Sequence, residues 1–139
     1  MSKQDISKDE IMAIYPKVAA IIADALGCDE DEVKPDSSLI DDLDAESIDF
    51  LDIVFRLERE FKVKIPRGKA IEEARGELSE EEFEQGGVVT PAGEAKLRAY
   101  LEEVPEDRIN SPVRSAEIPK LFTTETFCKM VIREQKSAA

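Results

Sequence analysis

The chain has 139 residues, of which 42% are hydrophobic, and this size and composition fit one globular domain with a modest core. Its 32 acidic residues outnumber 19 basic ones, and the net charge of -13 repels nucleic acids and anionic membranes while favouring partners with basic surfaces. The sequence has no histidine, which excludes a Ser-His-Asp triad, a Cys-His pair and a histidine metal site.

The two cysteines, Cys28 and Cys128, are far apart and form no CxxC pair, so we interpret both as packing residues. The acidic runs at 29–32 and 41–42 lack the spacing of an EF-hand, and we expect no metal site. There is no signal peptide and no apolar run long enough to span a bilayer. These observations predict a cytoplasmic protein that does not insert into membranes.

The first predicted helix covers residues 15–26, where apolar residues recur at helical spacing. Ser7 and Glu10 have the spacing of a capping box, but Pro16 removes a backbone donor. Either the helix kinks at Pro16 or the main helix begins there, and we expect the second, with a looser turn before it and an end at Gly27. Residues 28–46 then form a polar loop with four apolar anchors: Val33, Leu39, Ile40 and Leu43.

The second predicted helix runs from Ser47 to Phe61 and carries two apolar stripes. The first stripe suits a core and consists of Ile53, Val54, Leu57 and Phe61. The second consists of Ile48, Leu51 and Phe55, on the side of the helix that would carry the serine. Burial is the default expectation for such a stripe, and we favour contact with a partner or an acyl chain.

Residues 67–117 predict two further helices. One follows a capping box at Ser79, and the other follows Thr90-Pro91 and ends at Pro105, with Gly86-Gly87 between them. The apolar stripe of the second is small, so we expect it to pack on the bundle or on a partner; a flexible tether is the alternative. A last helix begins near Thr123-Thr124 and buries Phe127, Cys128, Val131 and Ile132, with a frayed tail after Glu134.

Two carboxylates flank Ser47: Glu46 directly before it and Asp49 two residues after it. A serine before a helix is ordinarily just an N-cap, and helix stability alone does not require this pair of acidic neighbours. The segment from Leu43 to Leu51 resembles the prosthetic-group site of acyl carrier proteins, whose usual form is Leu-Gly-x-Asp-Ser-Leu-Asp. The similarity continues at Ile65-Pro66 and near the C-terminus.

The resemblance implies that Ser47 is the attachment point of 4′-phosphopantetheine, whose thiol carries acyl groups as thioesters. It also implies that Glu46 helps a phosphopantetheinyl transferase to hold Mg²⁺ during loading. A helix N-terminus suits a phosphodiester, since it stabilises an anion by about 0.3–1 kcal/mol. Two residues depart from the family pattern, Asp44 in place of glycine and Glu46 in place of aspartate. Aspartate tolerates a positive φ, so we expect the turn to survive.

The same resemblance makes the second helix a docking surface for acyl-transfer or synthase enzymes with basic patches. The expected contact residues are Ile48, Asp49, Leu51, Asp52 and Phe55. A solvated acidic face near a helix N-terminus is the plainer explanation of the two aspartates. Arg56 and Arg59 interrupt the acidic run that is usual in the family, which indicates an altered set of partners.

The sequence thus predicts an all-α, four-helix acyl-carrier-like bundle in one domain over residues 1–139. The bundle comprises residues 11–66 and 118–133, and residues 67–117 form an insertion. We expect a monomeric carrier, similar to specialised bacterial members of the family, that serves fatty acid, lipid or secondary metabolism and catalyses nothing itself. The alternative is a carrier-like interaction protein that is never loaded and binds basic partners through its acidic face.

Overall fold

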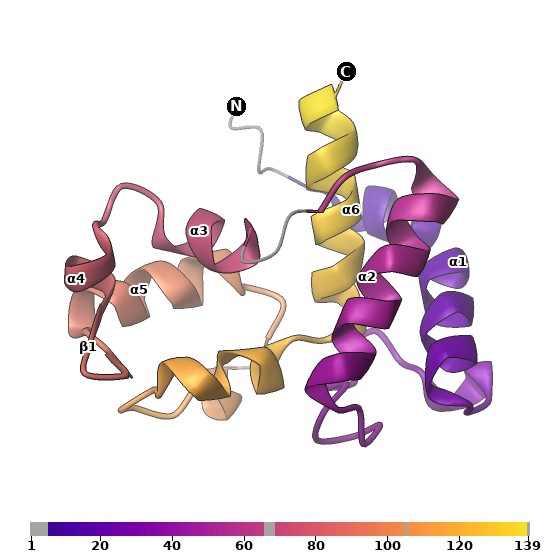
Figure 1. Cartoon of the computed structure of the whole chain (residues 1–139). Helices are drawn as coiled ribbons and strands as arrows, with labels where there is room; N and C mark the ends of the chain where they lie inside the picture. Colours follow the sequence, from indigo (N-terminus) through magenta and orange to yellow (C-terminus); the bar gives the residue numbers. More distant parts are fainter. Residues whose placement is uncertain (1–5, 66–68, 105, 139) are drawn as a thin grey trace. The chain divides into compact units, whose positions relative to one another are not determined.

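The computed structural model describes residues 6–65, 69–104 and 106–138 (Figure 1). The chain divides into two compact units, Met1–Ile65 with Thr123–Ala139, and Pro66–Phe122. We call them the bundle unit and the insert unit, and each is described by itself. The insertion predicted over residues 67–117 falls within the insert unit, which extends further because it includes the 3-10 helix η3 (Ser115–Leu121). The single-domain organisation stays a prediction, and Pro66 and Pro105 lie outside the described residues.

Three long helices form the bundle unit: α1 (Lys8–Leu26), α2 (Ser47–Phe61) and α6 (Thr124–Ala138), with a short 3-10 helix η1 (Glu30–Glu32) after α1. Helix α1 packs on both α2 and α6 (Figure 1). The core of the bundle unit contains six side chains that are at most 1% exposed: Val18, Ile22, Ile53, Leu57, Phe127 and Val131. The all-α class is confirmed, since the strands of the described chain amount to a single two-residue hairpin in the insert unit.

Helix α1 is longer than the sequence predicts, because it runs through Pro16 without ending there. The capping box at Ser7 and Glu10 is present, with Glu10 N–H donating to Ser7 Oγ at 3.1 Å and Ser7 N–H to Glu10 Oε1 at 3.1 Å. Buried Ile11 anchors the first turns. A capped and anchored start tolerates the one hydrogen bond that proline removes. The predicted end at Gly27 is confirmed, with φ at 71°.

The loop between α1 and α2 is fixed to the helices by buried residues and by one tyrosine. Of the predicted anchors, Val33 and Leu39 are buried, whereas Ile40 and Leu43 are half-buried. The hydroxyl of Tyr15 on α1 donates to the carbonyl of Val33 at 2.8 Å. Partial burial raises the pKa of Tyr15, so the hydroxyl stays a donor at neutral pH.

We expect Tyr15→Phe to lower the free energy of unfolding by about 1 kcal/mol, because it removes one hydrogen bond and leaves the ring in place. Chemical denaturation followed by circular dichroism measures this. An unchanged midpoint for the Tyr15 variant would show that the loop is held by its apolar anchors alone.

Helix α6 begins where the sequence predicts but continues to Ala138, through the segment after Glu134 that was predicted to be frayed. The N–H of Thr126 donates to Thr123 Oγ1 at 3.2 Å, and the N–H of Thr123 donates to Thr126 Oγ1 at 3.0 Å. The last turn also forms an ion pair with α1, between Lys136 Nζ and Glu10 Oε2 at 2.9 Å. The predicted inward residues are all buried: Phe127, Cys128, Val131 and Ile132.

The insert unit is built from short elements. They are α3 (Lys69–Arg75), α4 (Glu80–Phe83), β1 (Glu84–Gln85), β2 (Val88–Val89), α5 (Pro91–Tyr100), η2 (Glu106–Arg108) and η3. The capping box at Ser79 is confirmed, and so is the cap at Thr90, whose Oγ1 accepts the N–H of Gly93 at 3.0 Å. Helix α3 lies in a segment for which the sequence predicts no helix.

Gly86-Gly87 forms the turn of a β-hairpin. The sequence predicted that these glycines separate two helices. Their φ angles of 59° and 83° are the positive pair that a two-residue hairpin of type I′ requires. The helix that begins after Ser79 therefore ends at Phe83. A Cβ at Gly93 would lie 2.3 Å from the Phe83 carbonyl oxygen, so only glycine lets α5 approach α4 this closely.

The stripe predicted on α5 is buried in full: Leu97, Tyr100, Leu101 and Val104. The insert unit also buries residues that were not predicted to be buried, notably Phe83, Val89, Ile109 and Val113. The second predicted helix ends at Tyr100, before Pro105. The described part of the segment thus contains regular secondary structure and buries apolar side chains, which a flexible tether would not do.

We expect the backbone amides of residues 95–101 to exchange slowly with deuterium, because helical hydrogen bonds hold them and four buried side chains anchor the segment. Hydrogen exchange followed by mass spectrometry measures this on the whole chain. The exposed turn at 86–87 provides the fast reference. Equally fast exchange at 95–101 would show that the segment is a tether in solution.

Candidate functional site

The turn that precedes Ser47 contains a residue in the left-handed region. Asp44 has φ at 59°, and the next residue, Ala45, is buried and donates its N–H to the carbonyl of Leu39 at 2.8 Å. This is where the family pattern has glycine, so the prediction that aspartate preserves the turn is confirmed. The turn delivers Ser47 to the start of α2 as its first residue.

The N-cap of α2 is Glu46, and Ser47 lies inside the helix. The plainer reading of Ser47 as an N-cap is therefore wrong. The N–H of Glu46 donates to Asp49 Oδ2 at 2.8 Å, and the N–H of Asp49 donates to the Glu46 carbonyl at 2.9 Å. Asp49 thus stabilises the first turn of the helix in addition to any role on the surface.

An aromatic contact holds the first turns of α2 in place. Phe50 packs edge-to-face on Phe127 of α6, with ring centroids 5.4 Å apart and an interplanar angle of 89°. Ile53 and Leu57 follow on the buried side with no exposed surface. Phe50 was not among the predicted core residues, although its offset from Ile53 and Leu57 places it on the same face. The start of α2 is consequently a rigid platform.

The second apolar stripe of α2 is exposed. Ile48 is 70% exposed, Leu51 38% and Phe55 53%, which makes three of the large exposed hydrophobic residues of the described chain neighbours on one helix face. The three side chains form one apolar group on the surface next to Ser47, and they are not scattered singly. The default expectation of burial for this stripe is wrong.

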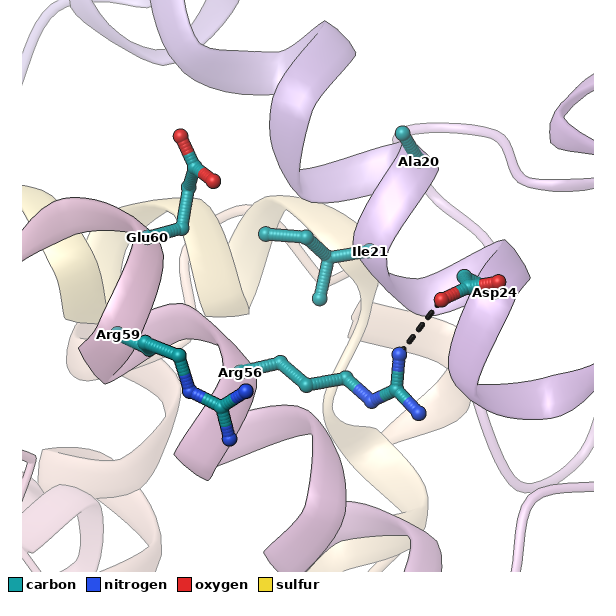
Figure 2. Close-up of a pocket in the computed structure, with 6 residues that line it drawn as sticks. All are labelled: Ala20, Ile21, Asp24, Arg56, Arg59 and Glu60. Carbon is teal, nitrogen blue, oxygen red and sulfur yellow. Dashed lines mark hydrogen bonds and ion pairs between the residues drawn. The ribbon is translucent and has the colours of Figure 1, made fainter.

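The acidic residues of this surface are less available than the sequence suggests. Asp52 Oδ1 accepts from Arg56 Nε at 3.1 Å, and Arg56 Nη1 also contacts Asp24 Oδ2 of α1 at 2.6 Å (Figure 2). These carboxylates raise the pKa of Arg56, with the hydrogen bond to Asp52 as the larger cause. The i,i+4 spacing of Asp52 and Arg56 could have revealed their pairing, whereas only the packing of α1 on α2 brings Asp24 to them.

Neither cysteine is exposed. Cys128 is fully buried on α6, and burial raises the pKa of its thiol to about 12, which keeps it protonated and inert. Cys28 is half-buried, and burial raises the pKa of its thiol as well. The assignment of Cys128 as a packing residue is confirmed. Within the described residues, no cluster of His, Cys, Asp or Glu could hold a metal ion, and no helix is both long and apolar enough to cross a membrane.

Comparisons with known proteins identify the family. The sequence pattern of the phosphopantetheine attachment site matches residues 16–75. The chain is 45% identical over 74 residues to the acyl carrier protein AcpXL of Rhizobium meliloti, covering 52% of this chain and 78% of the relative. This chain belongs to the acyl carrier protein family.

Further members of the family show a comparable similarity. The acyl carrier protein of Bdellovibrio bacteriovorus is 51% identical over 55 residues, covering 40% of this chain and 70% of the relative. That of Clostridium acetobutylicum is 46% identical over 57 residues, covering 41% and 74%. No solved structure matches the chain.

Family membership establishes the class of activity. The protein is a carrier and not an enzyme, and its prosthetic group is covalently attached 4′-phosphopantetheine. A carrier domain implies interaction with a phosphopantetheinyl transferase and with acyl-transferring enzymes. The geometry at the start of α2 fits this group, because the residues on both sides of Ser47 are exposed and the N-terminus of a 15-residue helix faces the site. The alternative of a carrier-like protein that is never loaded is not favoured.

Proposed function

We propose that Ser47 carries the 4′-phosphopantetheine arm. The observation that supports this most strongly is its position as the first residue of α2, directly after the left-handed turn at Asp44 and the cap at Glu46. The helix N-terminus stabilises the phosphodiester, and Phe50 on Phe127 keeps that terminus fixed. When bound, the arm supplies the thiol on which acyl groups are held as thioesters.

Glu46 is the residue that contacts Mg²⁺ in the complex with the transferase. Its side chain is exposed while its backbone N–H is engaged with Asp49, so the carboxylate projects from a fixed backbone. Co-expression with a phosphopantetheinyl transferase, followed by measurement of the intact mass, tests the proposal. We expect a gain of one phosphopantetheine mass; a chain recovered entirely without it would contradict loading.

Helix α2 docks the enzymes that load and unload the arm. Ile48, Leu51 and Phe55 supply the apolar contact, and Asp49 and Asp52 supply negative charge toward basic patches on the partner. Charges of this kind raise the association rate more than they add to affinity. The carrier acts in the cytoplasm as a monomer, in fatty acid or lipid biosynthesis.

A further inference from the structure

A positively charged hollow lies at the C-terminal end of α2. It is lined by Phe55, Glu58, Arg59, Lys62, Val63 and Lys64. Three cations face one carboxylate here, in a chain whose net charge is -13. Arg59, Lys62 and Lys64 are exposed, and the ring of Phe55 is 53% exposed beside them. The hollow therefore joins positive charge to apolar surface.

No ion pair within the described residues involves these three cations. By contrast, Arg56 binds two carboxylates and Lys17 pairs with Glu60 at 3.5 Å. Figure 2 shows this difference for neighbouring arginines, with Arg56 joined to Asp24 and Arg59 joined to none of the residues drawn.

The single carboxylate of the hollow is already engaged. Glu58 Oε2 accepts the N–H of Ile65 at 2.7 Å, which fixes the chain after α2. Lys62 ends the helix with φ at 56°, a backbone conformation that favours glycine or asparagine over lysine. The helix macrodipole accounts for a cation in the last turn, such as Arg59, but not for three cations around an exposed aromatic ring.

We propose that this hollow is a second docking point for an acyl-transferring enzyme, and that it takes an acidic segment of that enzyme. Carboxylates of the segment pair with Arg59, Lys62 and Lys64, and an apolar side chain of the segment packs on Phe55. The proposal rests on the proposed docking role of α2. Because Phe55 belongs to both surfaces, the hollow continues the apolar face of Ile48 and Leu51. A partner that fits the whole helix needs basic residues near Ser47 and acidic residues about three turns further along.

The test measures the rate of acyl transfer from the loaded carrier to an acyltransferase of the organism that makes it, and compares this rate between variants. In the double variant Arg59→Glu with Lys62→Glu, we expect the transfer rate at subsaturating carrier to fall about tenfold at low salt, with the difference shrinking as salt screens the charges. The control is Lys8→Glu with Lys34→Glu, which changes the net charge equally at exposed lysines that do not line the hollow. We expect this control to transfer at nearly the normal rate.

A second variant distinguishes the loss of charge from damage to the helix. Arg59→Gln with Lys62→Gln removes the charges without adding repulsion, and we expect an intermediate rate with unchanged helical circular dichroism. Restoration of the rate of the Glu variant by an acid-to-lysine change on the enzyme would identify the paired segment. Equal rates for the hollow variants and the parent carrier would overturn the proposal. Because every variant is first loaded and its mass measured, failure of loading in the parent chain would instead contradict the proposed function.

Discussion

Replacing Ser47 with alanine is expected to abolish loading and leave the fold intact. The Oγ atom of Ser47 is the one that would bond to phosphorus. A chain without it should gain no phosphopantetheine mass when it is co-expressed with a transferase. Because Glu46 and not Ser47 is the N-cap, no cap is lost. We expect the free energy of unfolding to change by less than about 0.5 kcal/mol, since alanine is a good helix former.

Ser79→Ala is the control, since Ser79 is an exposed serine at the start of another helix, α4, where it is the N-cap. This variant should be loaded like the parent chain, although it loses a true N-cap worth about 1 kcal/mol. Intact mass spectrometry and thermal unfolding of the two variants give both readouts. A Ser47→Ala chain that still gained the arm would place the attachment on a different serine.

Reversal of the acidic charges on α2 should slow acyl transfer from the loaded carrier. For Asp49→Lys combined with Asp52→Lys we expect a loss of about tenfold or more at low salt, through a lower association rate. Stopped-flow or initial-rate measurements over a range of ionic strength follow this effect. Equal rates at every salt concentration would argue that the partner does not use an acidic surface.

The structure separates two contributions to that result. Asp49 accepts the N–H of Glu46, and Asp52 is bound by Arg56, so the double variant changes local structure as well as charge. Asp49→Asn keeps an acceptor for the Glu46 N–H and removes the charge. If the loss in rate is electrostatic, this variant should show part of it at low salt and none at high salt. A loss that persisted at high salt would indicate damage to the first turn of α2.

Features that depend on neighbouring residues can be predicted from the sequence alone. The bounds of α2, the cap at Thr90, the end of α1 at Gly27 and the turn at Asp44 all follow from local backbone and side-chain preferences. The family resemblance likewise rests on a contiguous segment around Ser47. Local rules failed where two of them competed, as at Pro16, where a capped and anchored helix start outweighed the loss of one hydrogen bond.

Features that depend on residues far apart in the sequence are set by the packing of the helices. Apolar spacing shows that α2 has two stripes, but only the positions of α1 and α6 determine that Ile53 is buried and Phe55 is exposed. Charge availability is decided in the same way. Arg56 and Arg59 are alike in sequence, yet Asp24 on α1 is within reach of the first and leaves the second free to face a partner, because the packing of two helices sets the distance between their charges.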